Sequence, residues 1–348
     1  MIVGRDEDPE VVAVVPTLGG DLPRLEACLT SVLGSRTAAR LAVVVVWNDP
    51  RRAVPELGSV TVLRPGLNLG FPGGLAYARA AVTATYLWVV QDDMVVAPDC
   101  LDRLLDRLGR SDAPAVAAPV VLDEDGRVPA RSRGGMLDGQ GGISRMAPPE
   151  AVAPEDLDPV VDWVASSGSL IRLTAWDDAG GFDPAFFPLL WSDVDFGARV
   201  LAAGHRSVLE PAARVAHRVN GSTPPLLGEH LGSVQSARFA RKHRGEEPRA
   251  DLDPELDPAV LAAVARSATL GYVDLAQFAS RRTAELRRSA EELAAALDAS
   301  GNALAAATDR LAAADARAGA PAAETTRMRA TVSWRLTAPL RAVRRGIG

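Results

Sequence analysis

Two aspartates, Asp92 and Asp93, follow an apolar run at residues 86–90, separated from it only by Gln91. Carboxylates beside a buried strand are costly to leave without a partner, and hard divalent cations with phosphate oxygens are the partners that suit them. The alternative is a solvated turn, because aspartate also favours turns. The pair by itself is equally compatible with metal-and-phosphate chemistry and with a turn.

A second pair of acids, Asp193 and Asp195, follows an aromatic segment that ends at Trp191. The pattern after it predicts an amphipathic helix in which Ser192 is the N-cap and Asp195 completes a capping box. Both acids would then lie at the positive end of the helix dipole. From this segment alone the structural interpretation is favoured, because acids in the first turn of a helix are ordinary.

A glycine-rich segment at residues 64–78 leads into a predicted helix. Gly70, Gly73 and Gly74 allow close approach of the backbone, and a helix N-terminus favours an anion such as a diphosphate. The segment is neither a Walker A loop nor the G-x-G-x-x-G fingerprint of dinucleotide-binding proteins. By itself it is weak evidence for phosphate binding.

The elements that must position these residues follow from the apolar pattern. Four runs predict buried strands: 11–17, 41–49, 59–65 and 86–93. Two segments with helical spacing predict helices: 21–33 and 73–84. Continuous apolar strands alternating with helices indicate a parallel sheet covered on both faces, with ligands at the carboxyl ends of the strands. The first two strands end in Pro16-Thr17 and Asn48-Asp49.

Composition narrows the class of protein. The chain has 348 residues, of which 47% are hydrophobic, and its net charge of −6 argues against nucleic-acid binding. Cys28 and Cys100 match no metal or redox spacing, so we expect buried, reduced thiols. The sequence shows no apolar run of about 18 residues and no signal peptide, which predicts a cytoplasmic protein.

The order of the motifs is more specific than any one of them. They are Pro16-Thr17, Asn48-Asp49, Asn68 with Gly70, Gly73 and Gly74, Asp92-Asp93, Trp163 with Gly168, Gly180-Gly181-Phe182-Asp183, Asp193-x-Asp195 and His217. This succession, over residues 10 to 245, resembles the family 2 glycosyltransferases of the GT-A fold, especially the bacterial rhamnosyltransferase-like members. The resemblance implies an α/β fold, with a Rossmann-like, mostly parallel sheet and helices on both faces.

The resemblance also implies a function. It is an inverting transfer of sugar from a nucleotide-diphosphate sugar to a glycan or lipid-linked acceptor in bacterial cell-surface polysaccharide biosynthesis. A divalent metal, Mg²⁺ or Mn²⁺, would bridge the donor diphosphate and stabilise the departing nucleoside diphosphate.

The implied site residues fall into four groups. Asp193 matches the general base, and Asp93 and His217 match metal ligands. Donor binding falls on Pro16, Thr17, Asn48, Asp49, Asn68, Gly70, Gly73, Gly74 and Asp92. The acceptor side falls on Trp163, Gly168 and Trp191, although a strand tryptophan is more often a core residue. A loop at 123–159 is expected to be an acceptor loop or a lid.

Three positions depart from the family pattern. Trp47 stands where the family usually has an aspartate in the nucleobase-binding turn, Gln91 replaces the first metal-motif acid, and Ser192 replaces a glutamate. These departures leave open a nucleotide-sugar-binding protein without catalysis. A nucleotidyltransferase is a further alternative, disfavoured because no basic glycine loop follows the first strand.

The C-terminal third lies outside the resemblance. We expect a catalytic domain at 1–245, an acidic linker at 246–280, a helical or weak coiled-coil segment at 281–318 and a basic amphipathic tail at 319–348. Leucines on one heptad frame permit a homodimer or a solitary helix on the catalytic domain. Six arginines with Trp334 in residues 327–348 suit an anionic membrane surface, the alternative being a disordered tail. The protein would then lie in the cytoplasm, at the inner membrane face.

Overall fold

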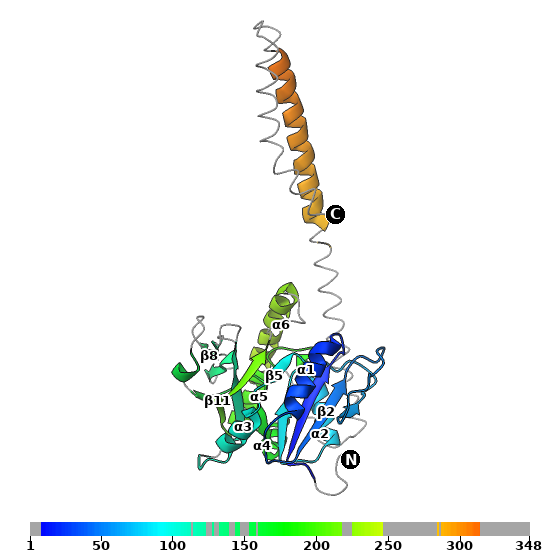
Figure 1. Ribbon diagram of the computed structural model, residues 1–348. Helices are drawn as coiled ribbons and strands as arrows, with labels where there is room; N and C mark the ends of the chain where they lie inside the picture. Colours follow the sequence, from blue (N-terminus) through cyan, green and yellow to red (C-terminus); the bar gives the residue numbers. More distant parts are fainter. Residues whose placement is uncertain are drawn as a thin grey trace. The chain divides into compact units, whose positions relative to one another are not determined.

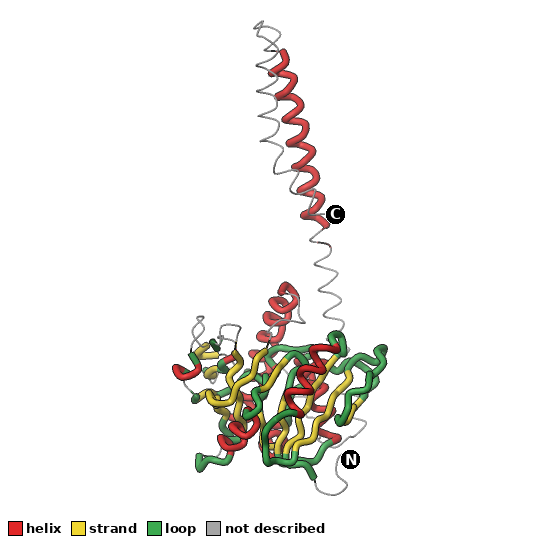
Figure 2. Tube along the Cα trace, in the orientation of Figure 1, coloured by secondary structure: helices red, strands yellow, loops and turns green. Residues whose placement is uncertain are grey.

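The computed structural model describes residues 8–112, 114–122, 127–128, 132–138, 143–146, 153–157, 159–217, 225–245, 284 and 287–313. The chain divides into two compact units, Met1–Val273 and Asp274–Gly348. In the first unit, strands form a twisted sheet flanked by helices (Figure 1; Figure 2). In the second, residues 287–313 form one helix. The expected catalytic domain of 1–245 lies within the first unit, while the expected linker and the basic tail lie outside the described residues.

One sheet carries nine of the described strands. They are β1 (Val11–Thr17), β2 (Leu41–Trp47), β3 (Thr61–Leu63), β4 (Tyr86–Val89), β5 (Met94–Val96), β6 (Val116–Leu122), β9 (Val160–Val161), β10 (Leu170–Arg172) and β11 (Ser207–His217). Their order is β3-β2-β1-β4-β10-β6-β11-β5, and β9 pairs with β11. Strands β3, β2, β1 and β4 are parallel, as are β6 and β11. The predicted α/β architecture is confirmed, and β5, β9 and β10 add antiparallel pairs.

Six helices and two short 3-10 turns complete the described part of this unit. The helices are α1 (Leu22–Leu33), α2 (Gly70–Ala81), α3 (Cys100–Leu108), α4 (Leu173–Ala179), α5 (Ser192–Ala202) and α6 (Pro225–His243). The 3-10 turns are η2 (Pro154–Asp156) and η3 (Pro184–Phe186). Within the loop expected at 123–159, β7 (Gly135–Leu137) and β8 (Ile143–Met146) pair as an antiparallel hairpin.

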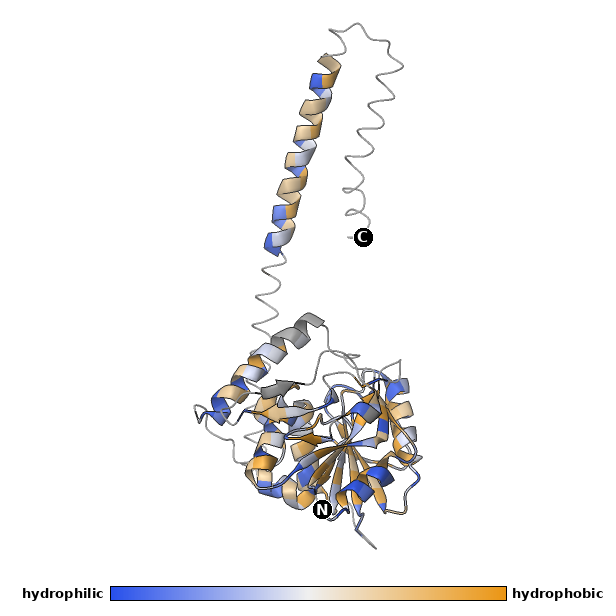
Figure 3. Cartoon of the chain, turned by 90° about the vertical axis from the view of Figure 1, so that its left-hand side faces the viewer, coloured by the Kyte–Doolittle hydropathy of each residue, from blue (hydrophilic) through white to orange (hydrophobic). Residues whose placement is uncertain are grey.

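Alternation along β1 divides the core into two layers. Val11, Ala13 and Val15 pack with buried side chains of α1 and α3, whereas Val12 and Val14 pack with those of α2, α4 and α5. Because every residue of β1 is buried, the strand reads as a continuous apolar run, as a strand covered on both faces must. Figure 3 shows the mostly apolar strands between the helices.

The predicted strand 86–93 is interrupted. β4 ends at Val89, and after a turn the chain continues as β5, which lies at the far edge of the sheet against β11. The turn residues Asp92 and Asp93 therefore lie where the chain leaves the middle of the sheet. Both cysteines are free and buried, as expected. Among the described helices, none combines the length and apolar character needed to span a bilayer.

Candidate functional site

The first polar contact joins the ends of two neighbouring parallel strands. Thr17, the last residue of β1, donates its hydroxyl to Asp92 Oδ2 at 2.5 Å. The same hydroxyl oxygen accepts the N–H of Gly19 at 2.9 Å. Burial raises the pKa of Asp92, an effect that the Thr17 hydrogen bond opposes and the charge of Asp93 reinforces. Asp92 is thus held by the protein at the carboxyl end of β4.

The two predicted metal ligands meet. His217 ends β11 and lies opposite Met94 of β5, so the residue before Met94 is brought beside it. His217 Nε2 lies 2.9 Å from Asp93 Oδ1, and the two side chains are 9% and 8% exposed. One carboxylate oxygen and one imidazole nitrogen at this spacing suit a divalent cation such as Mn²⁺. Within the described ranges, no third His, Cys, Asp or Glu completes a metal-binding group.

The side chain of Asn48 forms hydrogen bonds to the backbone of the glycine-rich segment. This side chain is buried, donates from Nδ2 to the Gly70 carbonyl at 3.0 Å and accepts the Leu69 N–H at 3.4 Å. Asn68 Oδ1 accepts the Gly70 N–H at 2.8 Å. A Cβ on Gly74 would come within 3.1 Å of Asn48 Nδ2. The segment therefore packs closely on the end of β2, and α2 begins at Gly70 rather than at the predicted residue 73.

Trp47 is a core residue. It is 2% exposed, its ring lies against the backbone of Gly19, and its Nε1 donates to the Arg52 carbonyl at 3.2 Å. The structure therefore shows core packing at this position, where the chain departs from the family pattern. The neighbouring Asp49 accepts the Arg51 N–H at 2.9 Å, a bond that lowers its pKa.

Asp193 lies in the first turn of α5, and within the described ranges its carboxylate has only backbone hydrogen-bond partners. Its carboxylate accepts the N–H of Val194 at 3.0 Å and of Ser166 at 3.3 Å. Burial raises the pKa of Asp193, and these two backbone bonds oppose the rise. A raised pKa makes a carboxylate a stronger base, which is the direction that general-base catalysis requires.

The segment after Ser166 ties Asp193 to the middle of the sheet. The Gly168 N–H donates to the carbonyl of Val89, the last residue of β4, at 3.0 Å. The indole of Trp88 donates to the Gly168 carbonyl at 2.9 Å. Asp193 thus shares the carboxyl end of β4 with the turn that carries Asp92 and Asp93. At Gly168, with φ +79°, a Cβ would lie 2.7 Å from Pro119 Cγ, so packing requires this glycine.

The predicted capping box at Ser192 is wrong. Trp191 is the N-cap, with φ 64° and no side-chain cap bond, and Ser192 is already the first helical residue. Asp195 Oδ2 instead accepts from Arg199 Nε and Nη2 at 3.0 and 2.7 Å. A side chain that points into the protein interior cannot reach back to a cap N–H.

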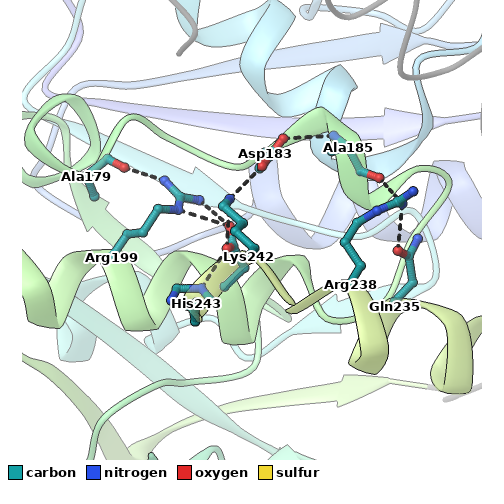
Figure 4. Close-up of polar contacts among 9 residues, drawn as sticks. Ala179, Asp183, Ala185, Arg199, Gln235, Arg238, Lys242 and His243 are labelled. Atoms are coloured by element: carbon teal, nitrogen blue, oxygen red, sulfur yellow. Dashed lines mark hydrogen bonds and ion pairs between the residues drawn. The ribbon is translucent and has the colours of Figure 1, made fainter. Parts of the chain in front are cut away.

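Two further partners of Asp195 come from α6, which the sequence interpretation did not single out. Lys242 Nζ and His243 Nε2 lie 2.8 and 3.0 Å from Asp195 Oδ1 (Figure 4). Burial raises the pKa of Asp195, but Arg199, His243 and Lys242 outweigh it and hold the pKa well below its usual range. Only a tertiary contact brings them together, so no local signal around Asp195 identifies them.

The aromatic residues expected on the acceptor side are mostly packed. Trp163 is 5% exposed, within a cluster of Phe186, Val194, Ala198 and Phe239. Its indole N–H has no hydrogen-bond partner in the part of the chain that the structure describes. Trp191 is partly exposed, and its ring centroid lies 5.4 Å from that of Phe239. Trp191 thus remains open to solvent on one side, whereas Trp163 is a core residue.

The glycosyltransferase-like family 2 model matches residues 9–229. The N-acetylglucosaminyl-diphospho-decaprenol L-rhamnosyltransferase of Mycobacterium tuberculosis is 31% identical over 270 residues, which are 68% of this chain and 86% of that enzyme. The solved structures that resemble this chain have lower sequence identity to it. A mannosyltransferase from Pyrobaculum calidifontis in complex with GDP-Man and Mn²⁺ is 17% identical over 80% of this chain and 78% of its own, with a TM-score of 0.46. GalNAc-T7 with UDP, GalNAc and Mn²⁺ is 14% identical over 61% and 44%, also at 0.46.

Proposed function

Since this chain belongs to glycosyltransferase family 2, we propose that it transfers a sugar from a nucleotide-diphosphate sugar to a polyprenyl-diphosphate-linked glycan. The mycobacterial relative is named for a decaprenyl-diphosphate-linked N-acetylglucosamine, which supports this class of acceptor. The product would belong to a bacterial cell-surface polysaccharide. The observation that carries the proposal is the meeting of Asp93 with His217 at the strand ends that also hold Thr17 and Asp92.

Asp93 and His217 fit a divalent cation. They are separate in sequence, nearly buried, and offer one oxygen and one nitrogen 2.9 Å apart. Such a cation, when bound, would stabilise the negative charge that develops on the departing nucleoside diphosphate. Two protein ligands suffice in this class of site, because Mg²⁺ commonly keeps waters and substrate phosphate oxygens in its coordination shell. Mg²⁺ or Mn²⁺ is therefore the expected cofactor.

Asp193 is the residue that we assign as general base. It accepts a proton from the acceptor hydroxyl as that oxygen bonds to the anomeric carbon, while the bond from this carbon to the diphosphate oxygen breaks. Attack on the face opposite the leaving group inverts the configuration of the anomeric carbon. Asp193 is partly buried and, among the residues that the structure describes, its carboxylate contacts backbone N–H groups and no cation. These features favour Asp193 as the base over Asp195, whose carboxylate is paired with Arg199 and Lys242.

The remaining predicted residues belong to donor binding. Thr17, Asp92, Asn48 and the glycine-rich segment lie at the same strand ends, and α2 begins there at Gly70. Pro16, Asp49, Asn68, Gly73 and Gly74 stay with the donor-binding group. Gly168 and Trp191 stay with the acceptor side, whereas the expected acceptor role of Trp163 is not kept, because its side chain packs in the core. At positions 70 and 74 glycine is also favoured by packing, because a Cβ at either position would lie close to other protein atoms.

The first experiment is transfer by the full chain with a panel of UDP-, GDP- and dTDP-activated sugars. N-acetylglucosaminyl-diphospho-decaprenol serves as acceptor, with Mn²⁺ or Mg²⁺ present. We expect a glycosylated lipid product from one donor and loss of that product in excess EDTA. Donor binding without product from any lipid-linked acceptor would favour a nucleotide-sugar-binding protein without catalysis instead.

A lipid-linked acceptor places the enzyme at the inner membrane face, and the basic segment 327–348 is the candidate for membrane contact. Each basic residue near an anionic surface contributes about 1 kcal/mol of binding. Flotation with liposomes that contain anionic lipid, with and without residues 327–348, tests this. Equal flotation of both forms would assign the segment another role. A homodimer through the helix at 287–313 remains a separate proposal, tested by sedimentation of the full chain with and without that helix.

A further inference from the structure

The segment that leads into Asp193 has a strained backbone. Leu190 and Trp191 are consecutive non-glycine residues with positive φ, at 72° and 64°. For side chains larger than glycine, such conformations are uncommon and persist only where the surroundings over-determine them. Something outside the segment must therefore hold it, and the position of Asp193 depends on that restraint.

One restraint comes from α2. The N–H of Phe71 donates to the Pro188 carbonyl at 2.8 Å, and Gly70 lies so close that a Cβ would come within 2.7 Å of the same oxygen. This contact joins the segment to the glycine-rich region that we assign to the donor. It leaves the opposite side of the segment to be held by another element.

That element is the C-terminal half of α6. Gln235, 1% exposed, donates from Nε2 to the Phe187 carbonyl at 2.7 Å. Arg238 donates to the Ala185 carbonyl and lies 3.0 Å from Gln235 Oε1 (Figure 4). The ring of Phe239, 2% exposed, packs on Trp191. The helix therefore contacts the segment at its carbonyl groups and at its strained tryptophan.

Lys242 connects the two ends of the segment. Its Nζ lies 2.5 Å from Asp183 Oδ2, at the start of η3, and 2.8 Å from Asp195 Oδ1, in α5. The three side chains are 9%, 6% and 0% exposed. Breaking an ion pair that is withdrawn from water is costly, because the remaining charge stays buried without compensation. Lys242 thus sets the separation of the residues that flank Asp193 in the chain.

We propose that the C-terminal half of α6 is the positioning element for the general base, with Lys242 and Gln235 as its positioning residues. These residues lie beyond residue 229, where the family match ends. They act on Asp193 through the segment 183–195 and do not touch the reacting atoms. The inference rests on the proposed role of Asp193.

The test compares Lys242→Met, Gln235→Leu and Lys242→Arg with the wild type, all as full chains. Arg107→Met is the control, because it removes a bidentate ion pair with Asp112 at 2.8 Å that does not contact the segment. Amide hydrogen exchange is measured across residues 187–195, and transfer is measured to N-acetylglucosaminyl-diphospho-decaprenol. Hydrogen exchange can be measured without any substrate. If Lys242→Met does not fold, Gln235→Leu still tests the proposal.

In Lys242→Met and Gln235→Leu, we expect faster exchange at the amides of residues 191–195, including the Asp195 N–H that donates to the Trp191 carbonyl. Because a 1 Å misplacement can cost about 100-fold in rate, kcat should fall by about 10- to 100-fold. The donor KM should change much less, and the acidic limb of the pH–rate profile should shift. Lys242→Arg should restore most of the rate, and Arg107→Met should resemble the wild type.

Wild-type exchange or wild-type kcat in folded Lys242→Met and Gln235→Leu would overturn the inference. Asp193→Asn separates this failure from failure of the proposed function. If Asp193→Asn is inactive while the α6 variants transfer normally, only the positioning role is wrong. If Asp193→Asn keeps the wild-type rate, the assignment of the base fails, and the inference fails with it.

Discussion

Asp195→Asn should destabilise the protein far more than the loss of a helix cap would. Asp195 is 0% exposed and is contacted by Arg199, Lys242 and His243 at 2.7 to 3.0 Å. Removing one partner from a buried ion pair costs about 3–5 kcal/mol, since the remaining cations stay buried without compensation. Losing a cap costs about 0.5–2 kcal/mol. A buried ion pair and a helix cap therefore predict clearly different losses in the free energy of unfolding for Asp195→Asn.

The assay is unfolding of the full chain by urea and by heat. At about 2–4 °C per kcal/mol for a domain of this size, the expected loss lowers the melting temperature by about 6–20 °C. Asp112→Asn is the matched control, because Asp112 also forms a bidentate arginine pair at 2.8 Å but is 41% exposed. Exposed pairs contribute about 0–1 kcal/mol. Equal losses in Asp195→Asn and Asp112→Asn would refute the buried-network interpretation.

The pH dependence gives the same prediction a second check. The pKa of Asp195 is lowered in the folded protein, so its contribution to stability is complete above the unfolded pKa of about 3.9. The contribution is lost as the pH falls below that value towards the folded pKa. The difference in free energy of unfolding between wild type and Asp195→Asn should therefore be constant near neutral pH and narrow in acid. A difference that grows on acidification would contradict this sign.

Three further predictions concern the site. Asp193→Asn should fold normally but lose about 10²- to 10⁴-fold in transfer, and the acidic limb of the wild-type rate should lie above the usual carboxyl pKa because burial raises that of Asp193; rates measured from pH 4 to 8 check both points. His217→Ala should raise the Mn²⁺ concentration needed for half-maximal transfer. Loss of a residue that only supports a metal ligand costs about 10- to 100-fold in metal affinity, so loss of a ligand should cost at least as much. A titration unchanged from wild type would remove His217 from the metal site. Gly70→Ala should destabilise more than Gly58→Ala, because both have φ near +68° (67° and 69°) but only at Gly70 would the Cβ meet backbone atoms; equal melting temperatures would contradict this.

Much of the sheet could be predicted because its strands are apolar on both faces. β1 was predicted at its observed bounds, and α1 to within one residue, since the spacing of Leu25, Leu29 and Val32 matches one buried helical face. The predicted strand extended to residue 93, whereas β4 ends at Val89, and β5 was not predicted as a separate strand. The apolar pattern of 86–90 and 94–96 is nearly continuous, and only the pairing of β5 with β11 separates them. The start of α2 was missed because glycines at a helix N-terminus carry no apolar periodicity.

Part of the candidate site could also be predicted from the sequence, and part of it depends on the tertiary structure. The order of the motifs was sufficient to identify the family and to propose Asp93, His217 and Asp193 as site residues, since residue types and their succession can be read directly from the sequence. The sequence could not determine that Trp47 packs in the core or that Asp195 pairs with Lys242 and His243. Such contacts join residues far apart in the chain, and their energies depend on burial and distance, which only the tertiary structure defines. For the same reason the expected capping box failed, because Lys242 and His243 of α6 bind the Asp195 carboxylate together with Arg199 of its own helix, and a local pattern cannot contain the two partners from α6.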